Sequence, residues 1–189
     1  MKEIELFINE EGEWLDRISL VDEPAIETDF MAFAKEHLMF SIDNDKHIIT
    51  GPVMIPEKRM WRNNFGGCYV YFSAETIKEA AYRWLIENRN HSFNLDHKND
   101  TYSVSIIESW ITEDTEKDKS TALGFTDIPK GTWFVSAKVD NDELWSKIKS
   151  GEFNGFSIEG TFILGEFEKQ HNKYEQDVIK EAEEFLKDF

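Results

Sequence analysis

The sequence predicts a fold of the α+β class, a small mixed β-barrel with helices inserted among its strands. Short runs of alternating apolar residues recur along most of the 189-residue chain, and amphipathic helical stretches interrupt them without a regular strand–helix repeat. Fifteen Phe and six Trp provide the aromatic area that a hydrophobic core requires. The length suits one domain with an appendage, which we divide into a barrel domain at residues 1–167 and a C-terminal amphipathic helix at residues 168–189.

Strands are predicted where β-branched and aromatic residues form short runs between turn residues. These runs lie at residues 6–8, 17–21, 47–55, 68–72, 102–112, 132–140 and 153–167. We expect Gly51-Pro52 to break the third run, because proline has no amide hydrogen to donate to a neighbouring strand. The polar stretch at residues 113–131 has few apolar residues, so we expect it to form a long surface loop.

Helices are predicted where apolar residues recur every three or four positions. The first begins after Ser73, whose hydroxyl can cap its first turn. Its expected buried face consists of Ile77, Ala80, Ala81, Trp84 and Leu85. A second helix, at residues 142–149, is expected to bury Leu144, Trp145 and Ile148. A short helix is expected around residues 30–37, and the helix at 168–189 is expected to dock on the barrel or on another subunit.

Composition and charge argue against several classes of function. The chain carries 38 acidic and 21 basic residues, and its formal net charge of −17 disfavours binding to nucleic acid through the phosphates. A single cysteine, Cys68, excludes an intramolecular disulfide and a cysteine-rich zinc site. No apolar run approaches the ~20 residues of a membrane span, and the first residues lack the order of a signal peptide. Because HExxH and glycine-rich phosphate-loop motifs are absent, we expect neither a metal nor an organic cofactor.

His97 is a candidate for general base catalysis. It lies in the polar stretch at residues 94–100, directly after the first helix and its loop. An imidazole at the edge of an element, with carboxylates nearby, can act as a base whose pKa its neighbours tune. On the pattern alone, an ordinary solvated loop histidine is the alternative interpretation.

Ser157 is a candidate nucleophile. Alternation along its strand places Phe156 and Ile158 on one face and Ser157 and Glu159 on the other. Glycines on both sides of this segment allow another backbone to approach closely. A serine hydroxyl needs an adjacent base to attack a carbonyl, and spacing alone does not place His97 beside it. A structural serine is the alternative interpretation.

Several stretches together carry a resemblance to a known family. They lie at residues 18–27, 51–56, 107–111, 118–120, 129–133 and 151–160, the last ending in Gly-Phe-Ser-Ile-Glu-Gly. In this order they resemble the phage serine proteases of the XkdF type, which are relatives of the prohead (capsid maturation) proteases of tailed phages. The resemblance covers about residues 15–165, and the combined order is specific although each stretch alone is not.

The resemblance implies a fold similar to that of herpesvirus assemblin, a small and mainly antiparallel β-barrel surrounded by helices. It also implies a serine nucleophile, carried onto Ser157, and a histidine base, carried onto His97. We place the third residue, which orients the base, first at Glu108, because Glu108 lies in a matching stretch. The alternatives are Asp96, Glu159, Glu166, His171 and two acids of the C-terminal helix, Glu181 and Glu184.

The function that the resemblance implies is that of a serine endopeptidase of phage capsid maturation. Its substrates would be segments of the phage scaffold and major capsid proteins, inside the procapsid that assembles in the bacterial host cytoplasm. We expect self-association as a further property, and neither nucleic acid nor membrane as a partner. The competing interpretation is a catalytically silent protein of the same fold that serves as a scaffold or internal head protein.

Overall fold

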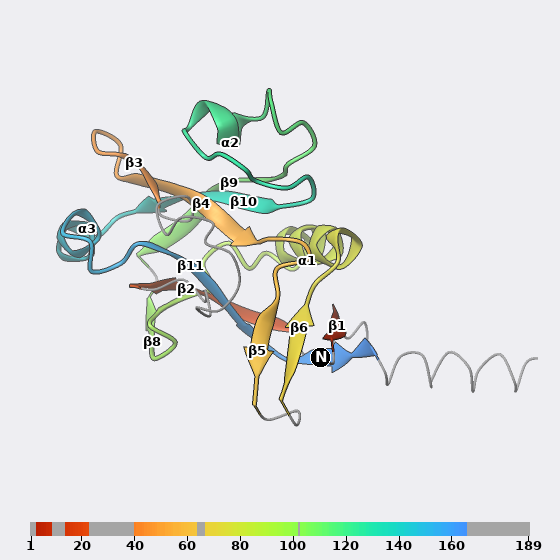
Figure 1. The fold of residues 1–189 in the computed structure, drawn as a ribbon. Helices are drawn as coiled ribbons and strands as arrows, with labels where there is room; N and C mark the ends of the chain where they lie inside the picture. The colour runs from red at the N-terminus through yellow and green to blue at the C-terminus, as the bar shows by residue number, and fades with distance from the viewer. Residues whose placement is uncertain (1–2, 9–13, 23–39, 64–66, 102, 166–189) are drawn as a thin grey trace, which may run out of the picture.

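The computed structural model describes residues 3–8, 14–22, 40–63, 67–101 and 103–165, which form three four-stranded sheets and three helices (Figure 1). The first sheet has the order β12–β1–β6–β5, with β1 at Glu3–Ile8, β5 at Met60–Arg62, β6 at Cys68–Tyr71 and β12 at Phe162–Leu164. The second has the order β3–β4–β10–β9, with β3 at Ser41–Asp43, β4 at Ile48–Met54, β9 at Val104–Ile111 and β10 at Trp133–Val139. The third has the order β11–β2–β7–β8, with β2 at Leu15–Val21, β7 at Phe93–Leu95, β8 at Asn99–Thr101 and β11 at Gly155–Gly160. The helices are α1 at Ala74–Ile86, α2 at Lys119–Ala122 and α3 at Asp142–Lys149.

The prediction of a mixed fold built mostly from strands is confirmed, but the predicted closed barrel is not found in the described part of the chain. Closure requires a continuous ladder of hydrogen bonds from the first strand to the last. Here each sheet ends in edge strands, and four of these edges, β12, β5, β3 and β8, are only three residues long. The ladders β1–β6 and β2–β7 are parallel, and the other ladders are antiparallel.

One hydrophobic core lies between the three sheets, and each sheet contributes buried side chains to it. The largest fully buried members are Trp14, Trp84 and Trp133. Trp84 contacts Trp14 and Trp133 edge to face, with ring centroids 6.4 Å and 6.1 Å apart. Such aromatic pairs contribute roughly 0.5–1.5 kcal/mol beyond their burial. The core therefore packs the three sheets and α1 against one another. The three-residue strands have few hydrogen bonds of their own, so this packing stabilises them.

Helix α1 begins where the sequence predicts. The Thr76 N–H donates to the hydroxyl of Ser73, and Glu75 complements the positive end of the helix dipole. Its buried face consists of Thr76, Ile77, Ala80, Ala81 and Trp84. Leu85 is 40% exposed and Ile86 is 78% exposed, because the last turn of the helix runs past the core. The predicted burial of Leu85 is therefore wrong.

The remaining predicted elements mostly lie where the periodicity places them. The strand runs at 6–8, 17–21, 68–72, 102–112 and 132–140 correspond to β1, β2, β6, β9 and β10. The run at 153–167 divides into β11 and β12, since Thr161 interrupts the ladder. Helix α3 buries its three predicted residues, and Asn141 caps it by accepting a hydrogen bond from the Leu144 N–H at 2.8 Å.

Strand β4 is continuous through Gly51-Pro52, so the predicted break is wrong. Its pairing with β10 shifts register between Trp133 and Phe134, which pair with Met54 and Pro52. This bulge leaves one residue of β4 without a partner and accommodates a proline that cannot donate to the ladder. The strand therefore continues past Pro52 with a β-bulge, where the sequence predicts a break.

The stretch at 113–131 contains more structure than a polar surface loop. Asp118 caps the short helix α2 by accepting a hydrogen bond from the Ser120 N–H. Phe125 and Ile128 are buried against Phe134 in a small second hydrophobic cluster, and Trp110 stacks on Phe134 at a centroid distance of 5.3 Å. These apolar contacts, together with the hydrogen bond that Trp110 Nε1 donates to Asp118, hold this segment against β9 and β10.

Some predictions lie outside the described residues. These are the short helix around residues 30–37, the C-terminal helix at 168–189 and, with it, the division of the chain at residue 167. A membrane-spanning helix would need a long apolar stretch, and none of the helices in the described ranges has one.

Candidate active site

The third sheet has one apolar face and one polar face. Paired residues of neighbouring strands point their side chains to the same side of a sheet. Ser157 pairs with Ser19, and Ser19 pairs with Asn94, so these three side chains form one row across β11, β2 and β7. Glu159 pairs with Arg17 two residues along the same strands. We call these five residues the polar face.

Ser157 lies on the polar face as the alternation of β11 predicts. Its neighbour Phe156 points into the core, with its ring centroid 4.6 Å from that of Phe40. Ser157 itself is only 7% exposed, so burial on the polar face is greater than the sequence indicated. Its hydroxyl makes no hydrogen bond to another described residue, which leaves its rotamer free to change.

Gly160 closes β11 against the start of β2. A Cβ on Gly160 would lie 1.9 Å from the carbonyl oxygen of Trp14, a distance that no side chain could occupy. The expectation that a glycine here permits a close backbone approach is confirmed. The register of β11 against β2 shifts between Glu159 and Gly160. Regular pairing of the two strands therefore ends at Glu159, next to this close contact.

His97 lies in the tight turn between β7 and β8. Asp96 and His97 have φ values of 49° and 57°, and the Lys98 N–H donates to the Leu95 carbonyl at 3.0 Å. Two successive left-handed residues are typical of a type I′ hairpin turn, in which the second position strongly favours glycine. A histidine there is strained, and such strain is often retained where a side chain has a function.

The imidazole of His97 reaches over the polar face. Its Nδ1 lies 2.9 Å from the hydroxyl oxygen of Ser19 and 3.5 Å from Oε2 of Glu159. The Asn94 side chain donates from Nδ2 to the same carboxylate oxygen at 2.7 Å and so holds Glu159 in place. The structure therefore brings His97 and Glu159 together. It does not bring His97 into contact with Ser157, whose neighbour across the β2–β11 ladder, Ser19, is the hydroxyl that His97 contacts.

A polar depression surrounds this group of side chains. Its lining residues are Asp16, Arg17, Asn94, His97, Lys98, Asp100 and Glu159. The Arg17 Nε donates to Asp100 at 3.0 Å, and this hydrogen bond lowers the pKa of the Asp100 carboxyl. The side chain of His97 remains 41% exposed and that of Glu159 46% exposed. Solvent and a ligand can therefore reach the base from this side.

Glu108 lies elsewhere in the fold. It is exposed on β9 in the second sheet, where its carboxylate accepts a hydrogen bond from Nζ of Lys119. Hydrogen bonds from Lys119 and Ser136 lower the pKa of Glu108. The structure does not bring Glu108 to His97, and the acid beside His97 is Glu159. Asp96 occupies the turn next to His97, and the remaining candidates for the third residue, Glu166, His171, Glu181 and Glu184, lie outside the described residues.

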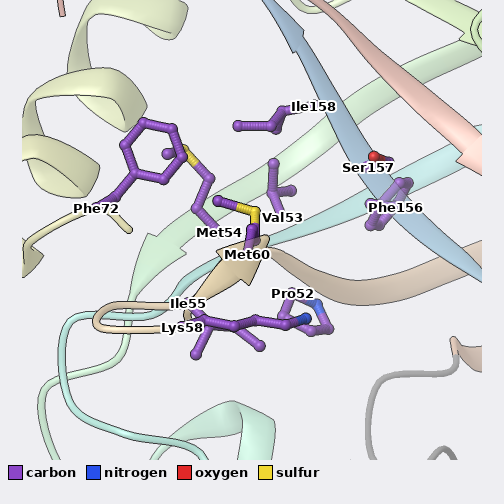
Figure 2. A pocket seen from close by; sticks show the side chains of 10 residues that line it. All are labelled: Pro52, Val53, Met54, Ile55, Lys58, Met60, Phe72, Phe156, Ser157 and Ile158. Carbon is purple, nitrogen blue, oxygen red and sulfur yellow. The ribbon is translucent and has the colours of Figure 1, made fainter. Parts of the chain in front are cut away.

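An apolar cavity lies beside Ser157 at the edge of β11 (Figure 2). The residues that line it are Pro52, Val53, Met54, Ile55, Lys58, Met60, Phe72, Phe156, Ser157 and Ile158. Burial lowers the pKa of Lys58 from its usual 10.5 to about 8. The cavity can accept an apolar side chain, and Lys58 is the single cationic group among its lining residues.

A second serine–histidine contact lies away from this site. The hydroxyl of Ser105 is 2.9 Å from Nδ1 of His91, at an exposed position on β9. Unlike His97, His91 has no carboxylate within ion-pair distance in the described part of the chain. His91 and Ser105 therefore provide matched controls for substitutions at His97 and Ser19. The described ranges hold no cluster of three side chains suited to a metal ion.

Ser19 and Asn94 were not identified from the sequence. Ser19 interrupts the apolar run Ile18–Val21 and is fully buried, and a buried hydroxyl requires a partner. A serine within an apolar run indicates a buried polar contact, but its partner can be identified only from the pairing of β2 with β7 and β11. Asn94 belongs to a three-residue strand that pairs in parallel, which no local pattern predicts.

Comparison with known proteins assigns the chain to a family. A sequence model described as "Putative phage serine protease XkdF" matches residues 35–166, and the chain belongs to this family. The chain is 27% identical over 154 residues to the phage-like element PBSX protein XkdF of Bacillus subtilis (strain 168). The match covers 76% of this chain and 51% of that protein, so the chain spans about half the length of the relative. No solved structure matches.

Proposed function

We propose that this protein is a serine endopeptidase of phage capsid maturation in which Ser157 is the nucleophile and His97 the general base. Glu159, rather than Glu108, is the third residue of the site and stabilises the protonated form of the base. The observation that carries the proposal is the position of His97 Nδ1, 3.5 Å from the Glu159 carboxylate, on the face of the sheet that carries Ser157. Membership in the family of phage serine proteases supports the same reaction class.

The reaction follows the chemistry of other serine hydrolases. The Ser157 hydroxyl attacks the scissile carbonyl while His97 receives its proton, and the imidazolium then donates a proton to the leaving amine. Water hydrolyses the acyl-enzyme in the second half of the reaction with the same base. Asn94 holds the Glu159 carboxylate, so that the negative charge stays beside Nδ1 as the imidazole becomes positive. Backbone amides near Gly155 or from residues 113–131 are the proposed oxyanion donors.

The cavity beside Ser157 supplies a place for a substrate side chain. Its walls include Met54, Met60 and Phe72, and methionine side chains adapt to apolar groups of different shapes. An extended peptide placed along β11 could therefore hold an apolar side chain in this cavity. Binding of this kind would position the scissile bond and contribute to the rate.

The proposed substrates are segments of the phage scaffold and major capsid proteins, cleaved inside the procapsid in the host cytoplasm. The phage origin of the family and the relative from a phage-like element support this setting. Self-association of the protease during assembly is part of the proposal.

A catalytically silent scaffold or internal head protein is the second candidate. The observation that favours it is the contact of His97 with Ser19 instead of Ser157, together with the 7% exposure of Ser157. Serine proteases that lack direct contact between nucleophile and base in the free state can tighten when substrate binds, which keeps the enzyme as the first candidate.

Co-expression with the neighbouring capsid and scaffold proteins separates the two candidates. We expect processing with the wild-type chain and with His91→Ala, and none with Ser157→Ala or His97→Ala. The His91→Ala control removes an imidazole that also contacts a serine hydroxyl, but at the second serine–histidine contact. Equal processing by wild type and Ser157→Ala would remove Ser157 as the nucleophile.

A further inference from the structure

We propose that Ser19 is a positioning residue that relays the proton between Ser157 and His97. This inference rests on the proposed function, because it assumes Ser157 as nucleophile and His97 as base. It assigns a role to a fully buried hydroxyl that neither the sequence motifs nor the family description singles out.

The position of Ser19 carries the inference. Its hydroxyl oxygen lies 2.9 Å from Nδ1 of His97, which is a hydrogen-bond distance. On the other side, Ser19 pairs directly with Ser157 across the β2–β11 ladder. Directly paired residues of antiparallel strands have Cβ atoms about 4.5–5.5 Å apart, and their hydroxyls can form a hydrogen bond across the strands. No hydrogen bond joins the two hydroxyls in the structure, so the relay requires the Ser157 side chain to turn toward Ser19, which contacts His97.

The proton passes from Ser157 to His97 in two transfers through Ser19. The Ser19 O–H proton moves to Nδ1 of His97, and the Ser157 O–H proton moves to Ser19 Oγ. The Ser157 oxygen then forms a bond to the substrate carbonyl carbon, and Ser19 is a neutral hydroxyl again. The net change is the transfer of one proton from Ser157 to His97. When the leaving amine departs, Nδ1 of His97 returns a proton to Ser19 Oγ while the Ser19 O–H donates its proton to the amine nitrogen, because the Ser157 oxygen is then bonded to the acyl carbon.

The relay requires one orientation of the hydrogen bond. Ser19 must donate to an unprotonated Nδ1, so neutral His97 carries its proton on Nε2. After the transfer, the new Nδ1–H faces both Ser19 and Glu159, which lies 3.5 Å away. The charged groups around the imidazole are Asp16, Arg17, Lys98, Asp100 and Glu159. Of these, Glu159 contacts the nitrogen that gains the proton, so it stabilises the product of the relay.

The first test measures the rate at which a fluorophosphonate modifies the protein, as a function of pH. The reagent forms a bond from phosphorus to the serine oxygen and releases fluoride. We expect Ser19→Ala to react about 10-fold or more slowly than wild type and to lose the rise in rate with pH that a general base produces. Ser19→Thr keeps the hydroxyl and is expected to recover most of the rate. The control Ser105→Ala is expected to react like wild type.

The second test does not depend on activity. Nitrogen NMR of the histidine side chains, assigned with His97→Ala, reports which ring nitrogen of neutral His97 carries the proton. The relay predicts an unprotonated Nδ1 in wild type and a changed His97 signal in Ser19→Ala. A protonated Nδ1 would overturn the relay, even if the isolated protein failed to react with the fluorophosphonate.

The outcomes separate the relay from the function on which it rests. If Ser157→Ala reacts as fast as wild type, the proposed function fails. If Ser157→Ala does not react and Ser19→Ala reacts at the wild-type rate, the relay alone is wrong. An adduct on Ser19 itself would also overturn the relay, because Ser19 would then be the nucleophile.

Discussion

Oε2 of Glu159 lies 3.5 Å from Nδ1 of His97, and Glu159 is the second residue after Ser157 on the same strand. One strand therefore supplies the proposed nucleophile and the acid beside the base, and a hairpin turn two strands away supplies the base. The period of two places both β11 side chains on one face. A slip of one residue in the β11–β2 register would turn both to the core side, so the site depends on this register.

We predict that Glu159→Gln lowers protease activity and that Glu108→Gln does not. The amide keeps the shape of the side chain but removes the negative charge that faces Nδ1 of His97. The loss should be at least about 10-fold, a part of the ~10²–10⁴-fold that a general base contributes. Cleavage rates of the two variants, measured with the same substrate, test the assignment. A larger loss in Glu108→Gln would restore Glu108 as the third residue.

The turn that carries His97 makes a prediction about stability. His97→Gly and His97→Ala both remove the imidazole and its contact with Ser19, so both should be inactive. Glycine adopts positive φ without cost, whereas alanine at φ 57° is strained. We therefore expect the free energy of unfolding, from urea titration, to be about 1 kcal/mol higher for His97→Gly. Equal stabilities would mean that residue 97 does not hold the left-handed conformation.

The sequence predicted the long elements and the face of β11 on which Ser157 lies, whereas the roles of Ser157 and His97 stay predictions. The elements and contacts that the sequence did not predict have local causes. Helix α1, strand β10 and the face of Ser157 each follow a strong periodicity. Strands β3, β5, β7 and β8 have three residues each and are too short to show a period. Glu159 shares the face of Ser157, but its approach to His97 requires the parallel pairing of β2 with β7, which a local pattern does not contain.

The lowered pKa of Lys58 predicts how the free energy of unfolding depends on pH. Burial lowers its pKa from 10.5 to about 8, so between these values the unfolded chain binds the proton and the folded chain does not. This lysine therefore makes the free energy of unfolding rise with pH from about 8 to 10.5. Lys58→Met should stabilise the protein at pH 7 by about 1–2 kcal/mol, a figure reduced because the side chain is partly exposed.

Urea unfolding at pH 7 and pH 10 measures this effect, with Lys117→Met as the control. Lys117 is exposed in the segment before α2, so its substitution should leave the pH dependence as in wild type. A Lys58→Met protein with the stability of wild type at both pH values would contradict the account of the cavity.

The lowered pKa of Glu87, at the end of α1, predicts a loss of stability at low pH. Burial alone would raise its pKa, but hydrogen bonds from Arg83, Arg89 and Trp14 outweigh this effect and lower the pKa to about 2. Because the folded-state pKa lies below the usual 4.5, the stabilisation is present above pH 4.5 and is lost as pH falls toward 2. Glu87→Gln should cost about 1 kcal/mol at pH 7 and much less near pH 2.5.

Thermal or urea unfolding of Glu87→Gln at these two pH values gives the comparison. The matched control is Glu79→Gln, an exposed acid on the same helix, which should change stability little at either pH. If Glu87→Gln loses the same stability at pH 2.5 as at pH 7, the carboxylate is not what holds Trp14 and the two arginines together.

Activation of Ser157 by His97 can be measured by locating a covalent fluorophosphonate adduct by mass spectrometry. We expect one adduct, on the peptide that contains Ser157, in wild type and in His91→Ala. We expect no adduct in His97→Ala. An adduct on another serine, or one that forms equally well without the His97 imidazole, would contradict this assignment.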